Sequence, residues 1–164
     1  LGYKYSTVGA LTVSVADIKI PPEKQQMLDA TDVKVAEVNE LYQEGLLSED
    51  ERYMRVIDLW NSCTHALRDR ILPNLDPFNP IRMFTDSGAR GSSAQVSQLA
   101  GMRGLMASPT GKTVELPIRA NFREGLNVLE FFLSSHGSRK ALSDTAMKTA
   151  DSGYLTRRLV DISQ

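Results

Sequence analysis

The residues most suggestive of nucleotide chemistry are Thr110-Gly111-Lys112-Thr113, because phosphate-binding loops end on glycine, lysine and a hydroxyl residue. The complete pattern also requires a glycine five positions before Gly111, where this sequence has Met106. A proline, Pro109, stiffens the same segment. We therefore expect a turn here and no phosphate-binding loop.

Other catalytic patterns are incomplete. Cys63 is the only cysteine, which excludes an internal disulfide and a multi-thiolate zinc site and favours a small core residue. The two histidines, His65 and His136, are far apart in the sequence. The chain has neither a Gly-x-Ser-x-Gly nucleophile motif nor an Asp-rich metal motif. The residue pattern therefore argues against a free-standing hydrolase.

The stretch from Ser143 to Tyr154 is unusual because nearly all its side chains are small or polar. Thr145, Thr149 and Gly153 recur at four-residue spacing and share one helix face, which Arg157 continues. A helix facing a hydrophobic core would carry Leu or Ile there. Two interpretations stay open. The stretch is either a surface helix of low apolar content or a helix that lets nucleic acid approach its backbone, flanked by phosphate-compatible cations.

Composition is that of an ordinary globular protein, with 41% hydrophobic and 24% charged residues. No run of about 18 apolar residues exists, so we expect no membrane span. Residues 1–76 carry 8 Lys and Arg against 13 Asp and Glu, whereas residues 77–164 carry 11 against 7. This asymmetry would suit an acidic protein-binding part and a basic nucleic-acid-binding part.

Two amphipathic segments predict a helical hairpin. Apolar positions at spacings of 3 and 4 indicate helices over residues 23–44 and 49–72. Gly45 is suited to end the first helix, and Ser48 with Glu51 forms a capping box at the start of the second. The two stripes should pack as an antiparallel hairpin of coiled-coil type.

The remaining elements are less regular. Alternation over Leu11–Val15 predicts a strand, and residues 114–118 predict another. A proline-rich linker starting at Pro73 should precede a loop over 86–92 and a helix over 93–106. The rest is predicted to be helical, with breaks at Gly125, Gly137 and Gly153. The expected fold class is mainly α with few short strands, divided into residues 1–76, 77–120 and 121–164.

Four long strings in the sequence closely resemble one protein family. They are Asp86-Ser-Gly-Ala-Arg-Gly-Ser92, Gln98-Leu-Ala-Gly-Met-Arg-Gly-Leu-Met-Ala107, Asn121-Phe-Arg-Glu-Gly-Leu126 and Asp144-Thr-Ala-Met-Lys-Thr-Ala-Asp-Ser-Gly-Tyr-Leu-Thr-Arg-Arg-Leu-Val-Asp161. All four resemble the largest (β′) subunit of bacterial-type multisubunit DNA-directed RNA polymerase, and residues 51–58 match it more loosely. The resemblance implies an internal segment of a much longer, cytoplasmic chain that works on the bacterial nucleoid.

The resemblance implies a role for each part. The hairpin resembles the helices at the rim of the secondary channel, where Glu51 and Asp58 would contact Gre-type transcription factors. Residues 79–106 resemble the pore segment and its F-loop. In that segment Arg90, Gln98 and Arg103 would lie near the incoming nucleotide.

Residues 127–163 resemble the bridge helix that crosses the main cleft. The resemblance implies that six residues there lie nearest the template or nucleotide: Arg139, Lys148, Thr149, Ala150, Tyr154 and Arg157. The glycines would then act as hinges. Small side chains would let a base pair pack against the helix backbone.

The resemblance also implies partners and cofactors. The chain would work with the β, α and ω subunits, a sigma factor, template DNA and RNA, and no membrane. It would hold no metal itself, because the Mg²⁺ ligands of the complete nucleotidyltransferase lie outside it, and it would be inactive alone. The alternative is an isolated protein-interaction module whose acidic hairpin docks secondary-channel factors.

Overall fold

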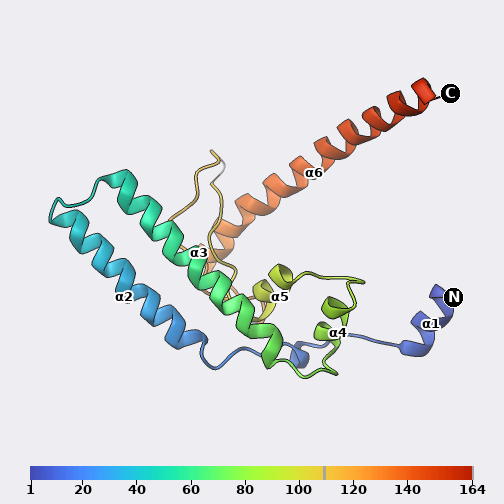
Figure 1. The fold of residues 1–164 in the computed structure, drawn as a ribbon, viewed down its shortest axis with the longest axis horizontal. Coiled ribbons are helices and arrows are strands. Elements are labelled where there is room, and N and C mark those ends of the chain that lie inside the picture. The colour runs from blue at the N-terminus through green and yellow to red at the C-terminus, as the bar shows by residue number, and fades with distance from the viewer. Residues whose placement is uncertain (109, 164) are drawn as a thin grey trace. The chain divides into compact units, whose positions relative to one another are not determined.

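The computed structural model describes residues 1–108 and 110–163 and is mainly helical (Figure 1). Its elements are α1 (Gly2–Gly9), the short 3-10 helix η1 (Val15–Asp17), α2 (Lys24–Gln43), α3 (Glu49–Asn74), α4 (Pro80–Asp86), α5 (Ser93–Ala100) and α6 (Val128–Ser163). The chain forms two compact units. One contains residues up to Leu105 together with Glu115–Leu126, and the other contains Met106–Val114 with the chain from Asn127 onward. The predicted fold class is confirmed.

The helical hairpin is confirmed, with both helices within two residues of their predicted ends. Gly45 adopts a positive φ of 78°. Its N–H donates to Tyr42 O at 3.0 Å while the N–H of Leu46 donates to Leu41 O at 3.0 Å, which is the Schellman arrangement. At the start of α3 the Ser48 N–H donates to Glu51 Oε2 at 3.0 Å. These caps set the short connection that lets α2 and α3 pack side by side.

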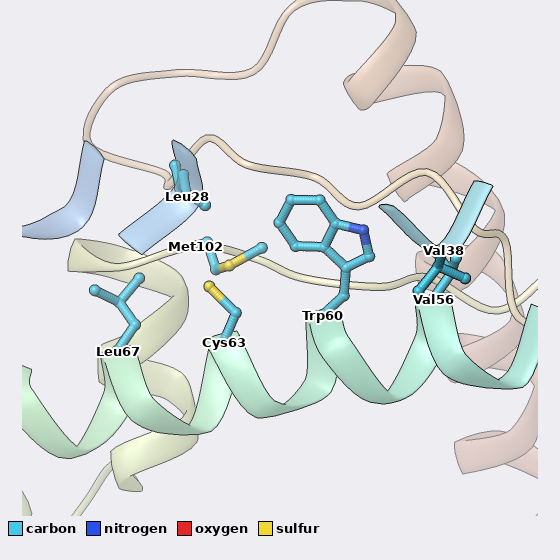
Figure 2. Packing of buried hydrophobic residues seen from close by; sticks show 7 residues of the cluster. All are labelled: Leu28, Val38, Val56, Trp60, Cys63, Leu67 and Met102. Carbon is cyan, nitrogen blue, oxygen red and sulfur yellow. The ribbon is translucent and has the colours of Figure 1, made fainter. Parts of the chain in front are cut away.

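The core of the first unit lies along one face of α3, where Val56, Trp60, Cys63, Leu67 and Ile71 are all buried. The α2 residues Leu28 and Val38 cover the first part of this face. Figure 2 shows the Met102 side chain reaching in among them from the chain that follows α5. Ile71 belongs to a second cluster with residues of α4 and α5. α3 is therefore the central element, packed on α2 and on α5.

Both predicted strands are wrong. Residues 11–15 form no strand, since they pass from coil into η1, and Leu11, Val13 and Val15 are all exposed. Alternation needs a partner strand, and the described residues offer none there. Residues 114–118 form no strand either, since only Ile118 pairs there, in a single antiparallel bridge with Gly104, while Thr113 just before the segment pairs with Ala107.

Several boundaries also differ from expectation. α3 continues through Pro73, which the prediction placed in the linker, and α4 was not predicted. The predicted helix over 93–106 stops at Ala100, because Gly101 leaves helical geometry with φ −100° and ψ −106°. α1 forms ahead of the predicted strand, where no helix was predicted.

Of the three helix breaks predicted in the last segment, those at Gly137 and Gly153 are wrong. α6 runs for 36 residues through Gly137 and Gly153 as one uninterrupted helix (Figure 1). Only Gly125 lies outside it, with a φ of 86° in the preceding loop. A glycine costs about 1 kcal/mol in a helix interior. Two such residues among 36 do not outweigh the bonded turns on either side.

Candidate functional site

The candidate nucleic-acid face lies on α6, which is about 54 Å long at 1.5 Å per residue. All six of its predicted site residues are exposed: Arg139, Lys148, Thr149, Ala150, Tyr154 and Arg157. Thr149, Ala150, Tyr154 and Arg157 fall within successive turns and share one side of the helix. Arg139 and Lys148 are nine residues apart, so the helix spreads these positions along its length.

The threonine hydroxyls of α6 do not project from the helix, because they donate hydrogen bonds to carbonyl oxygens of the preceding turn. Thr145 Oγ1 donates to Ala141 O at 2.7 Å, and Thr149 Oγ1 donates to Thr145 O at 2.7 Å. A hydroxyl bonded to the preceding turn leaves its methyl group facing outward. With Ala146 and Ala150 alongside, this side of α6 offers small, mostly apolar groups. Such a surface can pack against a flat base.

The cations of α6 are available to a ligand. Arg139, Lys148 and Arg157 form no ion pair with any described residue. Arg158 instead lies over the Tyr154 ring, 4.5 Å from its centroid. An exposed guanidinium or ammonium that is not engaged in an ion pair is suited to a phosphate. The helix thus combines backbone access with phosphate-compatible charge.

The fold brings the three residues predicted to line the pore only partly together. Gln98 lies on α5, and its carbonyl accepts a 3.1 Å hydrogen bond from the N–H of Phe122. The Phe122 ring in turn lies beneath the guanidinium of Arg103, at 5.0 Å. Phe122 therefore joins Gln98 to Arg103. Arg90 is exposed in the loop before α5, and no hydrogen bond or ion pair joins it to either of them.

Arg103 is partly buried, and this burial changes the pKa of its side chain. Burial lowers the pKa of its guanidinium, and no described carboxylate offsets that loss of solvation. A partly buried cation held over an aromatic ring without an anionic partner is ready to receive an anion. Of the three residues predicted to line the pore, Arg103 is the one whose surroundings themselves suit an anionic ligand.

The two rim residues differ in their surroundings. The Glu51 carboxylate is used in the cap of α3, and hydrogen bonds from Ser48, backbone first and hydroxyl second, lower its pKa. Asp58 is exposed two turns further along α3, in a shallow groove that Arg55, Leu59 and Val38 also line. Asp58 is therefore the freer of the two acids for a partner.

Sequence reasoning missed Asn121 and the 115–119 segment. Asn121 is fully buried, and its side-chain amide binds the carbonyl oxygens of Ala100 and Gly101 at 3.1 Å. Glu115 and Arg119 form two-pronged ion pairs with the hairpin. These contacts join residues 20 to 87 positions apart, so no local pattern signals them.

Within residues 1–108 and 110–163, no group of three His, Cys, Asp or Glu side chains could hold a metal ion. No helix among these residues is long and apolar enough to cross a membrane.

The sequence matches two family models in succession. Residues 47–123 match RNA polymerase Rpb1, domain 4, and residues 125–164 match RNA polymerase Rpb1, domain 5.

Curated relatives match the chain along its whole length and indicate the same family. It is 61% identical over 163 residues, 99% of its length, to the DNA-directed RNA polymerase subunit beta′ of Clostridium tetani. It is 58% identical over its full length to the same subunit of Caldicellulosiruptor saccharolyticus and 60% identical to that of Caldanaerobacter subterraneus. It spans about 14% of the length of each of these relatives. The chain therefore belongs to the family of the largest, β′-type subunits of DNA-directed RNA polymerase, in the region of Rpb1 domains 4 and 5.

Proposed function

We propose that this chain works within a DNA-directed RNA polymerase, where it helps to position template and incoming nucleotide during RNA synthesis. In this proposal α6 is the bridge helix, residues 79–106 form the pore segment and the α2–α3 hairpin forms the secondary-channel rim. The chain is a part of a nucleotidyltransferase and is inactive alone. Identities near 60% to beta′ subunits over the full chain support this assignment.

The observation that carries the proposal is the exposure of α6. From Ser138 to Ser163 every residue but Asp144 is exposed, including large apolar ones. The exposed apolar residues are Leu142, Met147, Leu155, Leu159, Val160 and Ile162. A long helix with apolar residues on several sides is stable in water only when something packs on it. Surrounding polymerase subunits and nucleic acid would supply that packing.

The chemistry proposed for α6 is positioning. The side carrying Thr149 and Ala150 would pack against the nascent base pair, while Arg157 and Lys148 would neutralise backbone phosphates. None of these groups transfers a proton in this scheme. Mg²⁺ would be held by ligands outside this chain, as the family resemblance implies. Other polymerase subunits are the proposed protein partners.

The test is single-nucleotide addition by a complete polymerase that carries Ala150→Trp. An indole on the small side of α6 would displace the base pair, so we expect the rate to fall at least about tenfold with assembly intact. Ala36→Trp, the same change at an exposed alanine of α2, is the control and should leave the rate near wild type. Wild-type rates for Ala150→Trp would contradict the proposed orientation of α6.

A second function, docking of secondary-channel factors, is favoured by the groove beside Asp58. This groove lies on the hairpin, has an exposed carboxylate at its edge and contains the apolar Val38 and Leu59. A Gre-type factor that presents a basic residue to this groove would complement the Asp58 carboxylate. The acidic first turn of α3, with Glu49, Asp50 and Glu51, extends the same charge.

Binding of a Gre-type factor to the complete polymerase tests this second function. Asp58→Asn should weaken binding about three- to tenfold and flatten its salt dependence, since one charge pair is lost. Asp69→Asn, which changes an exposed acid further along α3, is the control and should have little effect. Equal binding by both variants would remove Asp58 from the docking surface.

A further inference from the structure

Residues 115–119, here named the strap, cross the hairpin and are held to it by two ion pairs of opposite polarity. The Arg52 guanidinium on α3 donates to both carboxylate oxygens of Glu115, at 2.8 and 3.0 Å. Arg119 donates to both carboxylate oxygens of Asp32 on α2, at 2.7 Å each. The strap thus supplies the anion of one pair and the cation of the other. Two-pronged pairs between planar groups fix orientation as well as distance.

Both guanidinium groups are also seated on aromatic rings. Arg52 lies 5.5 Å from the centroid of Tyr42, and its side chain is only 14% exposed. Arg119 lies 5.3 Å from the centroid of Trp60, the largest residue of the core. The ring contacts restrict where each guanidinium can move. Each end of the strap is therefore held on a defined spot of the hairpin.

Between its ends the strap is joined to the pore segment through the backbone. Ile118 is fully buried and exchanges two hydrogen bonds with Gly104, at 2.9 and 3.0 Å. The next pair joins the Arg103 N–H to Ala120 O at 3.2 Å. Gly104 has a φ of 86°, so few other residues would fit this pairing. A continuous path of contacts thus leads from the hairpin through the strap to Arg103.

We propose that Arg52 and Arg119 are positioning residues for nucleotide addition, which set the register of the strap on the hairpin and thereby the position of Arg103. This inference rests on the proposed function, in which Arg103 lies near the incoming nucleotide. The exposure of the second pair supports a positioning role, since Arg119 and Asp32 are 47% and 37% exposed. Ion pairs so exposed contribute little to stability. Their contribution is instead to fix the position and orientation of the strap on the hairpin.

The first experiment is single-nucleotide addition by a complete polymerase over a range of nucleoside triphosphate concentrations. Arg52→Lys keeps the charge but loses the planar two-pronged geometry. Because a contact from Arg103 to the nucleotide would exist before and during the reaction, we expect KM to rise about three- to tenfold and kcat to change less than about twofold. Arg70→Lys alters an arginine of α3 that pairs with Glu23 away from the strap, and KM should stay unchanged. A wild-type KM for Arg52→Lys would overturn the proposal.

Exchanging the two charges of one ion pair distinguishes a positioning role from a general loss of stability. The Arg119–Asp32 pair is suited to this test, because Arg52 also binds Glu49 whereas Asp32 and Arg119 share no second ionic partner among the described residues. Arg119→Glu alone should raise KM, and adding Asp32→Arg should restore it to within about twofold of wild type. Failure of the exchanged pair to restore KM would overturn the proposal.

Combination with Arg103→Ala distinguishes the inference from the function on which it rests. If Arg103→Ala raises KM and Arg52→Lys adds nothing to it, the strap acts through Arg103 as proposed. If the two effects multiply, the proposed pore role stands but the path through the strap is wrong. If Arg103→Ala leaves KM unchanged, the proposed role of Arg103 itself is wrong and the inference falls with it.

Discussion

The side-chain amide of Asn121 donates a 3.1 Å hydrogen bond to the carbonyl oxygen of Ala100, the last residue of α5. The same amide binds Gly101 O at 3.1 Å, and its Oδ1 accepts from the N–H of Glu124 at 2.8 Å. Asn121 is fully buried. It therefore satisfies the carbonyl oxygens at the end of α5 and ties them to the chain that leads toward α6.

Removing this amide should destabilise the first unit. Asn121→Ala leaves two buried carbonyl oxygens without their partner, which costs about 1–3 kcal/mol. Urea unfolding of the 164-residue chain, followed by the fluorescence of its single tryptophan, Trp60, would measure the loss. Asn61→Ala, at an exposed position of α3, is the control and should change stability by less than about 0.5 kcal/mol. Equal stability of the two variants would contradict the role given to Asn121.

Substitution of Gly101 should also destabilise the chain, because the position has no room for a side chain. A Cβ at this position would lie 2.8 Å from Ile71 Cδ1 and 2.9 Å from the backbone oxygen of Ser97. The Ser97 oxygen belongs to α5 and cannot move aside without distorting the helix. Gly101→Ala should therefore destabilise the chain by about 1–3 kcal/mol in the same urea assay. Gly9→Ala, where a Cβ meets nothing within 4 Å, should change stability by less than about 0.5 kcal/mol.

The parts of the fold that could be predicted are those with a local cause. The hairpin follows from apolar spacing and from caps at Gly45 and Ser48, all within a few residues. The prediction of a strand over Leu11–Val15 was wrong, because alternating apolar residues form a half-buried sheet only where a second strand pairs with them. The strap and Asn121 could not be predicted, because their partners lie far away in the sequence. The roles proposed for the site residues came from family resemblance, whereas spacing indicated only that Thr149 and Arg157 share a helix face.

The capping box at the start of α3 should make the hairpin sensitive to acid. Hydrogen bonds from Ser48 lower the pKa of Glu51 below its ordinary value near 4.5. A carboxyl whose pKa is lower in the folded state stabilises that state above its unfolded pKa, and this contribution is lost as pH falls through the folded value. Glu51→Gln keeps a capping side chain but does not titrate. Its urea midpoint should therefore fall less steeply than that of wild type as pH drops below about 4.5. Parallel profiles would contradict this assignment.

Gly153 offers a test of why α6 stays unbroken. A Cβ there would meet nothing within 4 Å, whereas at Gly137 it would lie 2.8 Å from Met106 Cε. A peptide of residues 127–163 should be only partly helical alone, because few of its side chains pack on one another. Gly153→Ala should raise its helicity, measured by circular dichroism, by an amount equivalent to about 1 kcal/mol.

In the complete polymerase the same variant, Gly153→Ala, tests the hinge expected at Gly153. If local bending there accompanies translocation, the stiffer helix should slow nucleotide addition despite its greater stability. An unchanged rate would show that α6 works without bending at this position.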